Sequence, residues 1–266
     1  MNRRDILQAV LPTSAAVTVA HWASAVSAGQ QGGAALANGR ELYEWRTYKL
    51  SDNGQQSRLH QYLETACLPA WQRMGLGPVG AFTEIGPNAG PSIHVLLVYP
   101  TPQSLASSRE ALEQDAGYRE AAAEYLAAKK EDPAFDRIES SLLVAFAGAP
   151  QITPPAKKPR VLEVRTYENH GEDRARAKVQ MFDDGEIGIF PKCGFENVFF
   201  GETLIGPNLP NLKYMLAAPS MEANEAGWKK FLQHPDFRRM VADPKYAGTE
   251  PKITKLFLEP TPYSQV

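Results

Sequence analysis

The sequence predicts an α+β protein built from two tandem copies of one βαββαβ unit. The phrase "YEWRTYKL" at residues 43–50 returns as "LEVRTYEN" at 162–169, so the pattern Glu-x-Arg-Thr-Tyr occurs twice. A second phrase, "IGPN" at 85–88, returns at 205–208. Two phrases repeated in the same order at nearly the same spacing, 119 and 120 residues, indicate a duplicated fold unit.

Each unit is predicted to contain a strand, a helix, two strands, a helix and a last strand. Short runs rich in β-branched and aromatic residues, separated by Gly-Pro or polar turns, indicate the strands. The predicted strands are 41–50, 78–85, 92–99 and 139–146 in the first unit, and 160–168, 196–205, 211–218 and 253–259 in the second.

The helices are predicted from apolar periodicity and from capping residues. Leu59, Tyr62, Leu63, Ala66 and Ala70 recur at helical spacing and form one apolar stripe. We expect this helix to end near Pro69, because proline breaks or kinks a helix.

The second helix of each unit has its own start signal. Thr101 followed by Pro102 is a favourable N-cap with a first-turn proline, and Ser220 caps the matching helix.

This order of elements is the ferredoxin-like split βαβ plan, an antiparallel sheet with helices on one face. The other face of such a sheet needs a partner, and a second copy in the same chain supplies it. We therefore expect an intramolecular α/β barrel in which the two sheets face each other.

Five segments are predicted along the chain: a signal peptide over 1–28, a flexible spacer over 29–39, the first unit over 40–148, a linker over 149–159 and the second unit over 160–262. The linker assignment rests on its prolines and its lack of apolar periodicity.

The N-terminal segment resembles an export signal of the twin-arginine type. Arg3 and Arg4 precede a short, mildly apolar stretch, and small residues then offer cleavage after Ala25 or Ala28. The alternative is an N-terminal amphipathic helix. We expect the protein to be exported, periplasmic or secreted.

Composition narrows the range of partners. The formal net charge is −2, which gives no electrostatic reason to expect nucleic acid, and no other apolar run approaches a membrane span. A small-molecule ligand and self-association both remain open. So does the state of Cys67 and Cys193, which could form a bridge or stay as free thiols.

The chain also resembles a known family. The doubled Glu-x-Arg-Thr-Tyr strand, the Leu68-Pro69 helix end, the Ile-Gly-Pro turn and the final apolar strand are similar to those of NIPSNAP proteins, in the dimeric α/β-barrel superfamily. The resemblance covers both units. It implies a ferredoxin-like fold with barrel pairing and implies no established reaction. Related barrel families include small-molecule monooxygenases, isomerases and haem proteins.

The repeated strand has two chemically different faces, because successive side chains of a strand point to opposite sides. Glu44, Arg46 and Tyr48 share one face. Tyr43 and Trp45 lie on the other face with Thr47. We expect the apolar set to pack under the helices and the polar set to point into the barrel.

Two interpretations of the polar set remain open. Glu and Arg two positions apart can satisfy each other and hold the two halves in register. Alternatively, the arginines hold a carboxylate or enolate while the tyrosines donate a hydrogen bond. The candidate ligand-binding residues are Glu44, Arg46, Tyr48, Glu163, Arg165 and Tyr167.

Candidate catalytic residues are His94, Tyr48 and Arg46. If His94 faces the barrel, it is placed to act as a base or a haem ligand, with Lys213 as its counterpart in the second unit. The alternative is a core histidine with satisfied hydrogen bonds. The cofactor is unknown, since no nucleotide or zinc motif is present, and haem is the one specific candidate.

The sequence predicts an exported NIPSNAP-like protein that binds a small, partly apolar ligand in the barrel between its two sheets. One alternative is a small-molecule oxygenase or isomerase in which His94 or Tyr48 acts as acid or base and Arg46 stabilises an oxyanion. The other alternative is a structural protein that binds a protein partner.

Overall fold

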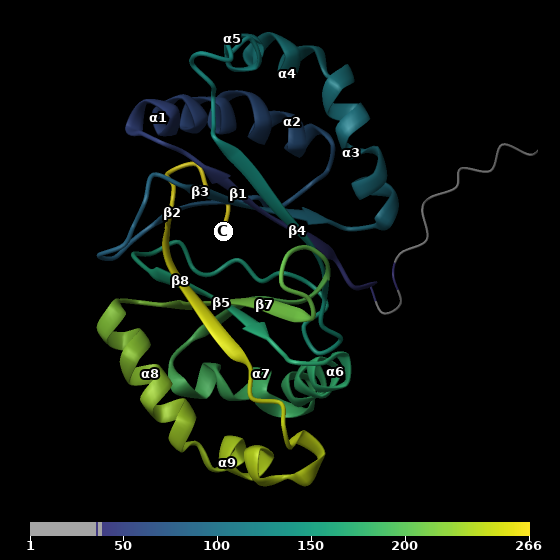
Figure 1. Ribbon diagram of the computed structural model, residues 1–266, viewed down its shortest axis with the longest axis vertical. Coiled ribbons are helices and arrows are strands. Elements are labelled where there is room, and N and C mark those ends of the chain that lie inside the picture. The colour runs from purple at the N-terminus through teal and green to yellow at the C-terminus, as the bar shows by residue number, and fades with distance from the viewer. Residues whose placement is uncertain (1–35, 37–38) are drawn as a thin grey trace, which may run out of the picture. The chain divides into compact units, whose positions relative to one another are not determined.

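A computed structural model describes residue 36 and residues 39–266, and the predicted signal peptide lies outside these residues. The described strands close into one antiparallel barrel in the order β1-β3-β2-β8-β5-β7-β6-β4 (Figure 1). The strands are β1 Leu42–Lys49, β2 Gly80–Glu84, β3 Ile93–Tyr99, β4 Arg137–Ala145, β5 Val161–Glu168, β6 Glu196–Ile205, β7 Asn211–Ala218 and β8 Lys252–Pro260.

Each half of the barrel comes from one repeat, and the halves join at two seams. Within the first repeat β1 lies between β3 and β4, and within the second β5 lies between β7 and β8. Across the repeats β2 pairs with β8 and β4 pairs with β6. The predicted intramolecular barrel of two ferredoxin-like units is confirmed.

The helices form two layers on opposite sides of the barrel (Figure 1). Those of the first repeat cover one side and those of the second repeat cover the other. The α-helices are α1 Asn53–Tyr62, α2 Leu68–Arg73, α3 Pro102–Gln114, α4 Ala116–Ala121, α5 Ala123–Leu126, α6 Glu172–Met181, α7 Ile187–Ile189, α8 Met221–Gln233 and α9 Pro235–Ala242. Two short 3-10 turns follow α7 and α9: η4 Pro191–Cys193 and η5 Pro244–Tyr246.

The predicted apolar stripe of the first helix is confirmed, since its five residues are buried. The prediction that this helix ends near Pro69 is wrong. A π-helical turn, η2 Leu63–Cys67, follows α1, and α2 then continues the helix to Arg73. In this wider turn the Leu68 amide donates a hydrogen bond to the carbonyl of Leu63. Pro69 has no amide hydrogen to donate, and the helix continues past it.

Both predicted caps are confirmed. The Thr101 hydroxyl accepts a hydrogen bond from the Ser104 amide at 3.0 Å, and the Ser220 hydroxyl accepts one from the Ala223 amide at 3.2 Å. Each cap satisfies an amide that has no partner within its own helix. These caps start α3 and α8, the helices that lie over the polar strand face of each repeat.

The barrel interior is an apolar core, which corrects the expected orientation of the repeated strand. Tyr43 and Trp45 point inward, and the interior also holds buried residues from all eight described strands. The buried members are Tyr43, Trp45, Phe82, Leu96, Val98, Leu143, Ala145, Leu162, Val164, Val198, Phe199, Met215, Ala217, Leu258 and Val266. Side chains therefore occupy the space where a ligand between the two sheets was predicted.

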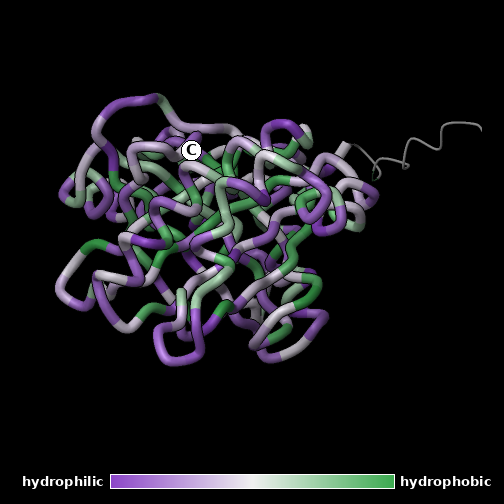
Figure 2. The backbone as a smooth tube through the Cα atoms, turned by 90° about the horizontal axis from the view of Figure 1, so that it is seen from above, coloured by the Kyte–Doolittle hydropathy of each residue, from purple (hydrophilic) through white to green (hydrophobic). Residues whose placement is uncertain are grey.

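A glycine in β2, the linker and the C-terminal residue also contribute to the packing of this core. A Cβ atom on Gly80 would lie 2.3 Å from the Phe82 ring, so only glycine permits the ring to sit there. Ile152 of the interdomain linker and the C-terminal Val266 both pack against the interior cluster. Figure 2 shows hydrophobic backbone segments running through the middle of the molecule and hydrophilic segments at its periphery.

Candidate ligand-binding site

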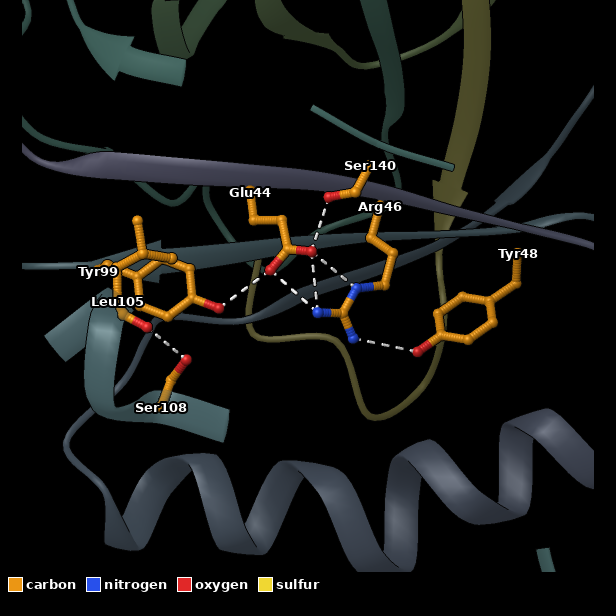
Figure 3. Close-up of polar contacts among 7 residues, drawn as sticks. All are labelled: Glu44, Arg46, Tyr48, Tyr99, Leu105, Ser108 and Ser140. Atoms are coloured by element: carbon orange, nitrogen blue, oxygen red, sulfur yellow. Dashed lines mark hydrogen bonds and ion pairs between the residues drawn. The ribbon is translucent and has the colours of Figure 1, made fainter. Parts of the chain in front are cut away.

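The polar face of the repeated strand lies under the helices, not inside the barrel. Figure 3 shows Glu44, Arg46 and Tyr48 extending from β1 toward the helical layer of their own repeat. They line a cavity together with residues of α3, α4 and α5. The expected orientation was reversed because the closed barrel excludes water and takes the bulky apolar side chains, whereas a cavity under the helices admits hydrated polar groups.

Glu44 is the centre of a polar network. Its Oε1 accepts from Arg46 Nε at 2.9 Å and from Ser140 Oγ at 2.7 Å, and its Oε2 accepts from Arg46 Nη2 at 2.9 Å and from Tyr99 Oη at 3.0 Å. Paired hydrogen bonds between guanidinium and carboxylate fix the geometry of both groups. Glu44 and Arg46 therefore satisfy each other, and the other partners of Glu44 belong to the same repeat.

Arg46 also reaches a third member of the strand face. Its Nη1 donates to Tyr48 Oη at 3.3 Å. Burial opposes the charged form of Arg46, but Tyr48 and Glu44 outweigh it, so the pKa of Arg46 rises and the guanidinium stays charged. Burial also raises the pKa of the Tyr48 phenol, which keeps that hydroxyl neutral.

The cavity beside this network has a volume of about 630 Å³. That size lies within the usual range of small-molecule sites. Its walls combine aromatic rings, aliphatic side chains and the polar strand face. The lining residues are Glu44, Arg46, Tyr48, Tyr62, Trp71, Tyr99, Leu105, Ser108, Arg109, Leu112, Glu113, Tyr118, Tyr125, Leu126, Phe135 and Ile138. We call it the first-repeat cavity.

One buried polar group of this cavity has no partner among the described residues. Tyr125 is 8% exposed, and its hydroxyl makes no hydrogen bond. Its ring stacks on Tyr62 at 3.7 Å between centroids, and the Tyr62 hydroxyl is 2.7 Å from that of Tyr118. An unsatisfied buried hydroxyl costs stability unless a ligand or water completes it.

In the second repeat the side chains of the same strand motif have different partners. Arg165 Nε donates to Glu163 Oε1 at 2.7 Å, and Glu163 Oε2 accepts from Asn224 Nδ2 and from Trp228 Nε1. The Trp228 ring lies over Arg165, with its centroid 3.2 Å from Cζ. The Arg165 side chain is 8% exposed, whereas that of Arg46 is 24% exposed.

The cause of this difference is one residue of a helix. Trp228 is the eighth residue of the 13-residue helix α8, and the eighth residue of the equally long α3 is Arg109. The Arg109 side chain is 90% exposed and pairs with Glu113 at 3.0 Å. It therefore leaves Arg46 accessible from the cavity.

A smaller hollow of about 300 Å³, the second-repeat cavity, lies under the helices of the second repeat. Its lining residues are Arg165, Tyr167, Lys178, Met181, Glu186, Trp228, Phe231, Leu232, Phe237, Val241, Tyr246, Thr249, Glu250, Pro251 and Ile253. Of the three candidates from this strand, Arg165 and Tyr167 line this cavity, and Glu163 lines a neighbouring hollow together with Arg165. Tyr167 also accepts a hydrogen bond from the Tyr214 hydroxyl at 2.8 Å.

His94 lies on the barrel side of β3 and is 4% exposed. Its Nδ1 is 2.9 Å from Thr47 Oγ1, its Nε2 is 2.9 Å from Glu84 Oε1, and its ring stacks on Trp45. The counterpart Lys213 donates to Thr166 at 3.0 Å. His94 is a core histidine with both ring nitrogens engaged.

Two expected roles of His94 therefore do not fit. Arg46 points to the opposite side of the strand layer, so the two residues do not meet at one point. A haem ligand needs a ring nitrogen available to the iron, and both nitrogens of His94 already have partners.

Metal ligands and thiols give no further site in the described part of the chain. No group of three or more His, Cys, Asp or Glu side chains there is placed to hold a metal ion. Cys67 and Cys193 are both buried and free.

None of the described helices is long and apolar enough to cross a bilayer.

Sequence reasoning missed most of the first-repeat cavity, notably Tyr125, Tyr99 and Trp71. One signal was available. The sequence of helix α3, "PQSLASSREALEQ", has Leu105 and Leu112 as its only large apolar residues, which do not form a continuous stripe. A helix of that kind cannot cover an apolar sheet face. It therefore indicates that the polar strand face lies beneath it.

The closed antiparallel barrel with external helices places this chain in the dimeric α/β-barrel class, here formed by one chain. The sequence pattern of the NIPSNAP family matches residues 43–150 and again residues 162–265. The chain belongs to the NIPSNAP family. No curated protein matches it.

Solved structures share the fold. A candidate monooxygenase of Lactobacillus acidophilus is 10% identical with a TM-score of 0.55 over 83% of this chain and 94% of its own. One of Fusobacterium nucleatum is 8% identical with a TM-score of 0.54 over 83% and 92%. A NIPSNAP-like domain protein of Burkholderia xenovorans is 19% identical with a TM-score of 0.36 over 41% and 90%. At such low identity the two candidate monooxygenases show a likeness of fold alone.

Proposed function

We propose that this protein binds a small, partly apolar, uncharged ligand in the first-repeat cavity. The observation that carries the proposal is the Tyr125 hydroxyl, which is buried in the wall of a cavity of about 630 Å³ and has no partner among the described residues. The hydroxyl oxygen itself exposes almost no surface, so a ligand oxygen would satisfy it after the Tyr125 side chain shifts toward the cavity. This location replaces the barrel interior that the sequence predicted.

The charges of the cavity support an uncharged ligand. Glu44 neutralises Arg46, and at the rim Glu113 pairs with Arg109, so neither sign is in excess. Apart from Ser108, the remaining walls are aromatic or aliphatic, which favours a flat, largely apolar ring system. A ligand hydroxyl or carbonyl would supply the single polar contact.

A matched pair of probes tests this assignment. 2-Naphthol and 2-methylnaphthalene have nearly the same shape and differ by a hydroxyl against a methyl group. Titration calorimetry should give each dissociation constant for the native protein and for Tyr125→Phe. A net hydrogen bond is worth about 1 kcal/mol, so the preference for 2-naphthol should fall about fivefold in the variant.

The variant removes only the hydroxyl and keeps the ring that stacks on Tyr62. If neither probe binds, or if the preference is unchanged in Tyr125→Phe, the assignment of this cavity is wrong. Native mass spectrometry of protein purified without added ligand gives a second reading. A stoichiometric extra mass that is lost in Tyr125→Phe supports the cavity.

We also propose that the protein is exported by a twin-arginine signal. The support is Arg3-Arg4 before a short apolar stretch, followed by small residues that end at Ala25 and Ala28. N-terminal sequencing of protein from the periplasmic fraction should begin at Val26 or Gly29. The variant Arg3→Lys with Arg4→Lys should accumulate uncleaved in the cytoplasm, and an unchanged distribution would contradict the proposal.

A further inference from the structure

The first half of β4 is a sheet edge that is open on one side. On its other side β4 pairs with β1 in an unbroken register from Arg137 to Val144. On the open side the neighbouring strand among the described residues is β6, and it pairs with residues 142–145 alone. Residues 137–140 are all exposed. We call residues 137–140 the β4 edge.

The backbone of this edge presents hydrogen-bonding groups to the open side. The Ala145 amide donates to the Glu41 carbonyl on the β1 side at 2.9 Å, and the Phe146 amide donates to a carbonyl of β6. Because these directions alternate along an antiparallel strand, the amides and carbonyls of Ile138 and Ser140 face the open side. An open strand edge of this kind is a template for pairing with another chain.

Large apolar side chains gather beside the β4 edge. Ile138 is 38% exposed, and the end of β6 with the turn after it exposes Leu204, Ile205 and Leu209 by 47%, 66% and 50%. This turn adjoins the edge, because Ile205 pairs with Leu142. Exposed apolar side chains next to an open edge indicate an interaction surface.

The equivalent edge of the second repeat differs in charge and in surroundings. Residues 252–256 of β8 pair with β5, while β2 pairs only with residues 258–260. This β8 edge carries Lys252 and Lys255, both exposed, and the neighbouring turn over residues 85–92 exposes no large apolar side chain. Lysines on an edge strand oppose pairing with another chain. The β4 edge has no lysine.

The order of charges on the β4 edge is complementary to itself. Arg137 and Glu139 lie on one face of the strand, and Ile138 between them lies on the other. When two copies of the edge pair antiparallel with Ile138 opposite Ile138, each Arg137 lies opposite Glu139 of the other copy. Opposite charges in directly opposed positions stabilise an antiparallel pair. Centring the contact on either neighbour instead would place two arginines or two glutamates face to face.

Glu139 has one partner in its own repeat. Its Oε2 is 3.9 Å from Lys49 Nζ, and the two side chains are 59% and 46% exposed. An ion pair this long between exposed side chains is weak. It leaves the Glu139 carboxylate accessible to the guanidinium group of a second copy.

We infer that two copies of this chain pair through their β4 edges into a closed twofold dimer. Ile138 lies at the twofold axis, the Arg137 and Glu139 side chains alternate across the contact, and Ile205 with its apolar neighbours flanks it. The contact uses the same surface on both copies, so assembly ends at two. The contact is short, so the dimer is weak. It adjoins the first-repeat cavity, which Ile138 also lines, but it does not depend on a ligand there.

Sedimentation velocity of the purified protein, from about 1 µM to about 500 µM, tests the contact. It should show a single concentration-dependent step from monomer to dimer. Ile138→Pro removes an amide that faces the open side and leaves pairing with β1 intact, so the dimer should be lost. Ile253→Pro makes the same change on the β8 edge, because Ile138 opposes Tyr48 as Ile253 opposes Tyr167, and it should leave the dimer unchanged.

Three results of this experiment would overturn the inference. One is a protein that stays monomeric throughout. Another is a dimer that persists in Ile138→Pro or dissociates in Ile253→Pro. The third is growth into larger assemblies, because a twofold contact closes at two copies.

Exchanging the two charges tests the register without proline. Arg137→Glu places two carboxylates face to face at two points and should weaken the dimer about tenfold. Adding Glu139→Arg to the same chain restores opposite charges and should recover the affinity. Both side chains are exposed, so both variants should fold. An unweakened dimer in the single variant, or no recovery in the double variant, would contradict the charge pairing.

A cysteine locates the twofold axis. Directly opposed residues in a hydrogen-bonded antiparallel pair have Cα atoms about 5.5 Å apart, which a disulfide can span. The native cysteines are buried. Mild oxidation should therefore link Ile138→Cys chains into covalent dimers and leave Ile253→Cys chains unlinked. An equal or greater yield of covalent dimer from Ile253→Cys would show that the β4 edge is not the contact.

Discussion

The indole ring of Trp228 lies over the guanidinium group of Arg165, with 3.2 Å between its centroid and Cζ. Arg109 holds the same helix position in the first repeat, and it leaves Arg46 accessible. One duplicated strand motif therefore serves two purposes. In the second repeat it is largely a covered structural cluster, and in the first it forms the wall of an open cavity.

Replacing Arg109 or Trp228 should change how accessible the arginine beneath it is. Arg109→Trp places an indole where it can cover Arg46, so 2-naphthol binding should weaken about tenfold with little change in stability, because Arg109 is exposed. Trp228→Ala should cost about 2 kcal/mol of unfolding free energy, since the indole is only partly buried. Titration calorimetry and urea unfolding measure these effects. Unchanged affinity in Arg109→Trp would show that this helix position does not control access.

Tyr125→Phe should stabilise the protein in the absence of ligand. The variant removes a buried hydroxyl that has no partner, so the unfolding free energy should rise by about 1 kcal/mol. Tyr118→Phe is the control. It breaks the contact with the Tyr62 hydroxyl and should lower the unfolding free energy by a similar amount. If both variants behave alike in urea unfolding, the Tyr125 hydroxyl has a partner after all.

Removing one partner of the Lys178–Glu186 pair should lower the unfolding free energy, whereas replacing both partners should change it little. Lys178→Leu leaves a buried carboxylate without its cation and should cost about 3 kcal/mol. Lys178→Leu with Glu186→Cys should recover most of that loss, because the first repeat is stable with Leu59 and Cys67 at the equivalent positions. Chemical unfolding of both variants decides this, and equal destabilisation of the two would refute it.

Glu186 should also make stability depend on pH. Burial raises its pKa, so the folded protein binds this proton more tightly than the unfolded chain. The stabilising contribution is greatest below the unfolded value of about 4.3 and is lost as pH rises through the folded pKa. The unfolding free energy of the native protein should therefore fall more steeply with rising pH above 4.3 than that of the double variant. Parallel pH profiles would contradict this.

Neither thiol should react in the folded protein. Burial raises the pKa of Cys67 to about 12, so at pH 8 about one Cys67 thiol in ten thousand is ionised. Burial raises the pKa of Cys193 as well. A thiol reagent at pH 8 should label both residues only after denaturant is added, with no disulfide detected by mass. Rapid labelling of native protein would show that a thiol is accessible.

The fold was largely predictable because it depends on patterns that act locally. A few neighbouring residues encode each of these patterns: the alternation of the strands, the stripe that includes Leu59 and Leu63, and the caps at Thr101 and Ser220. The duplication then implied that two sheets would face each other. The π turn before Pro69 was not predictable in this way, because apolar periodicity and capping residues do not distinguish a π turn from the α-helix around it.

The sequence by itself determined that Glu44, Arg46 and Tyr48 share one face, since alternation is a property of any strand. It did not determine which face is inside, because a period of two is the same for both faces. The tertiary structure decided which face is inside, because the closed barrel excludes water and buries Tyr43 and Trp45 in its interior. It also decided which arginine stays accessible, because the effect of Trp228 or Arg109 exists only once its helix lies over the strand.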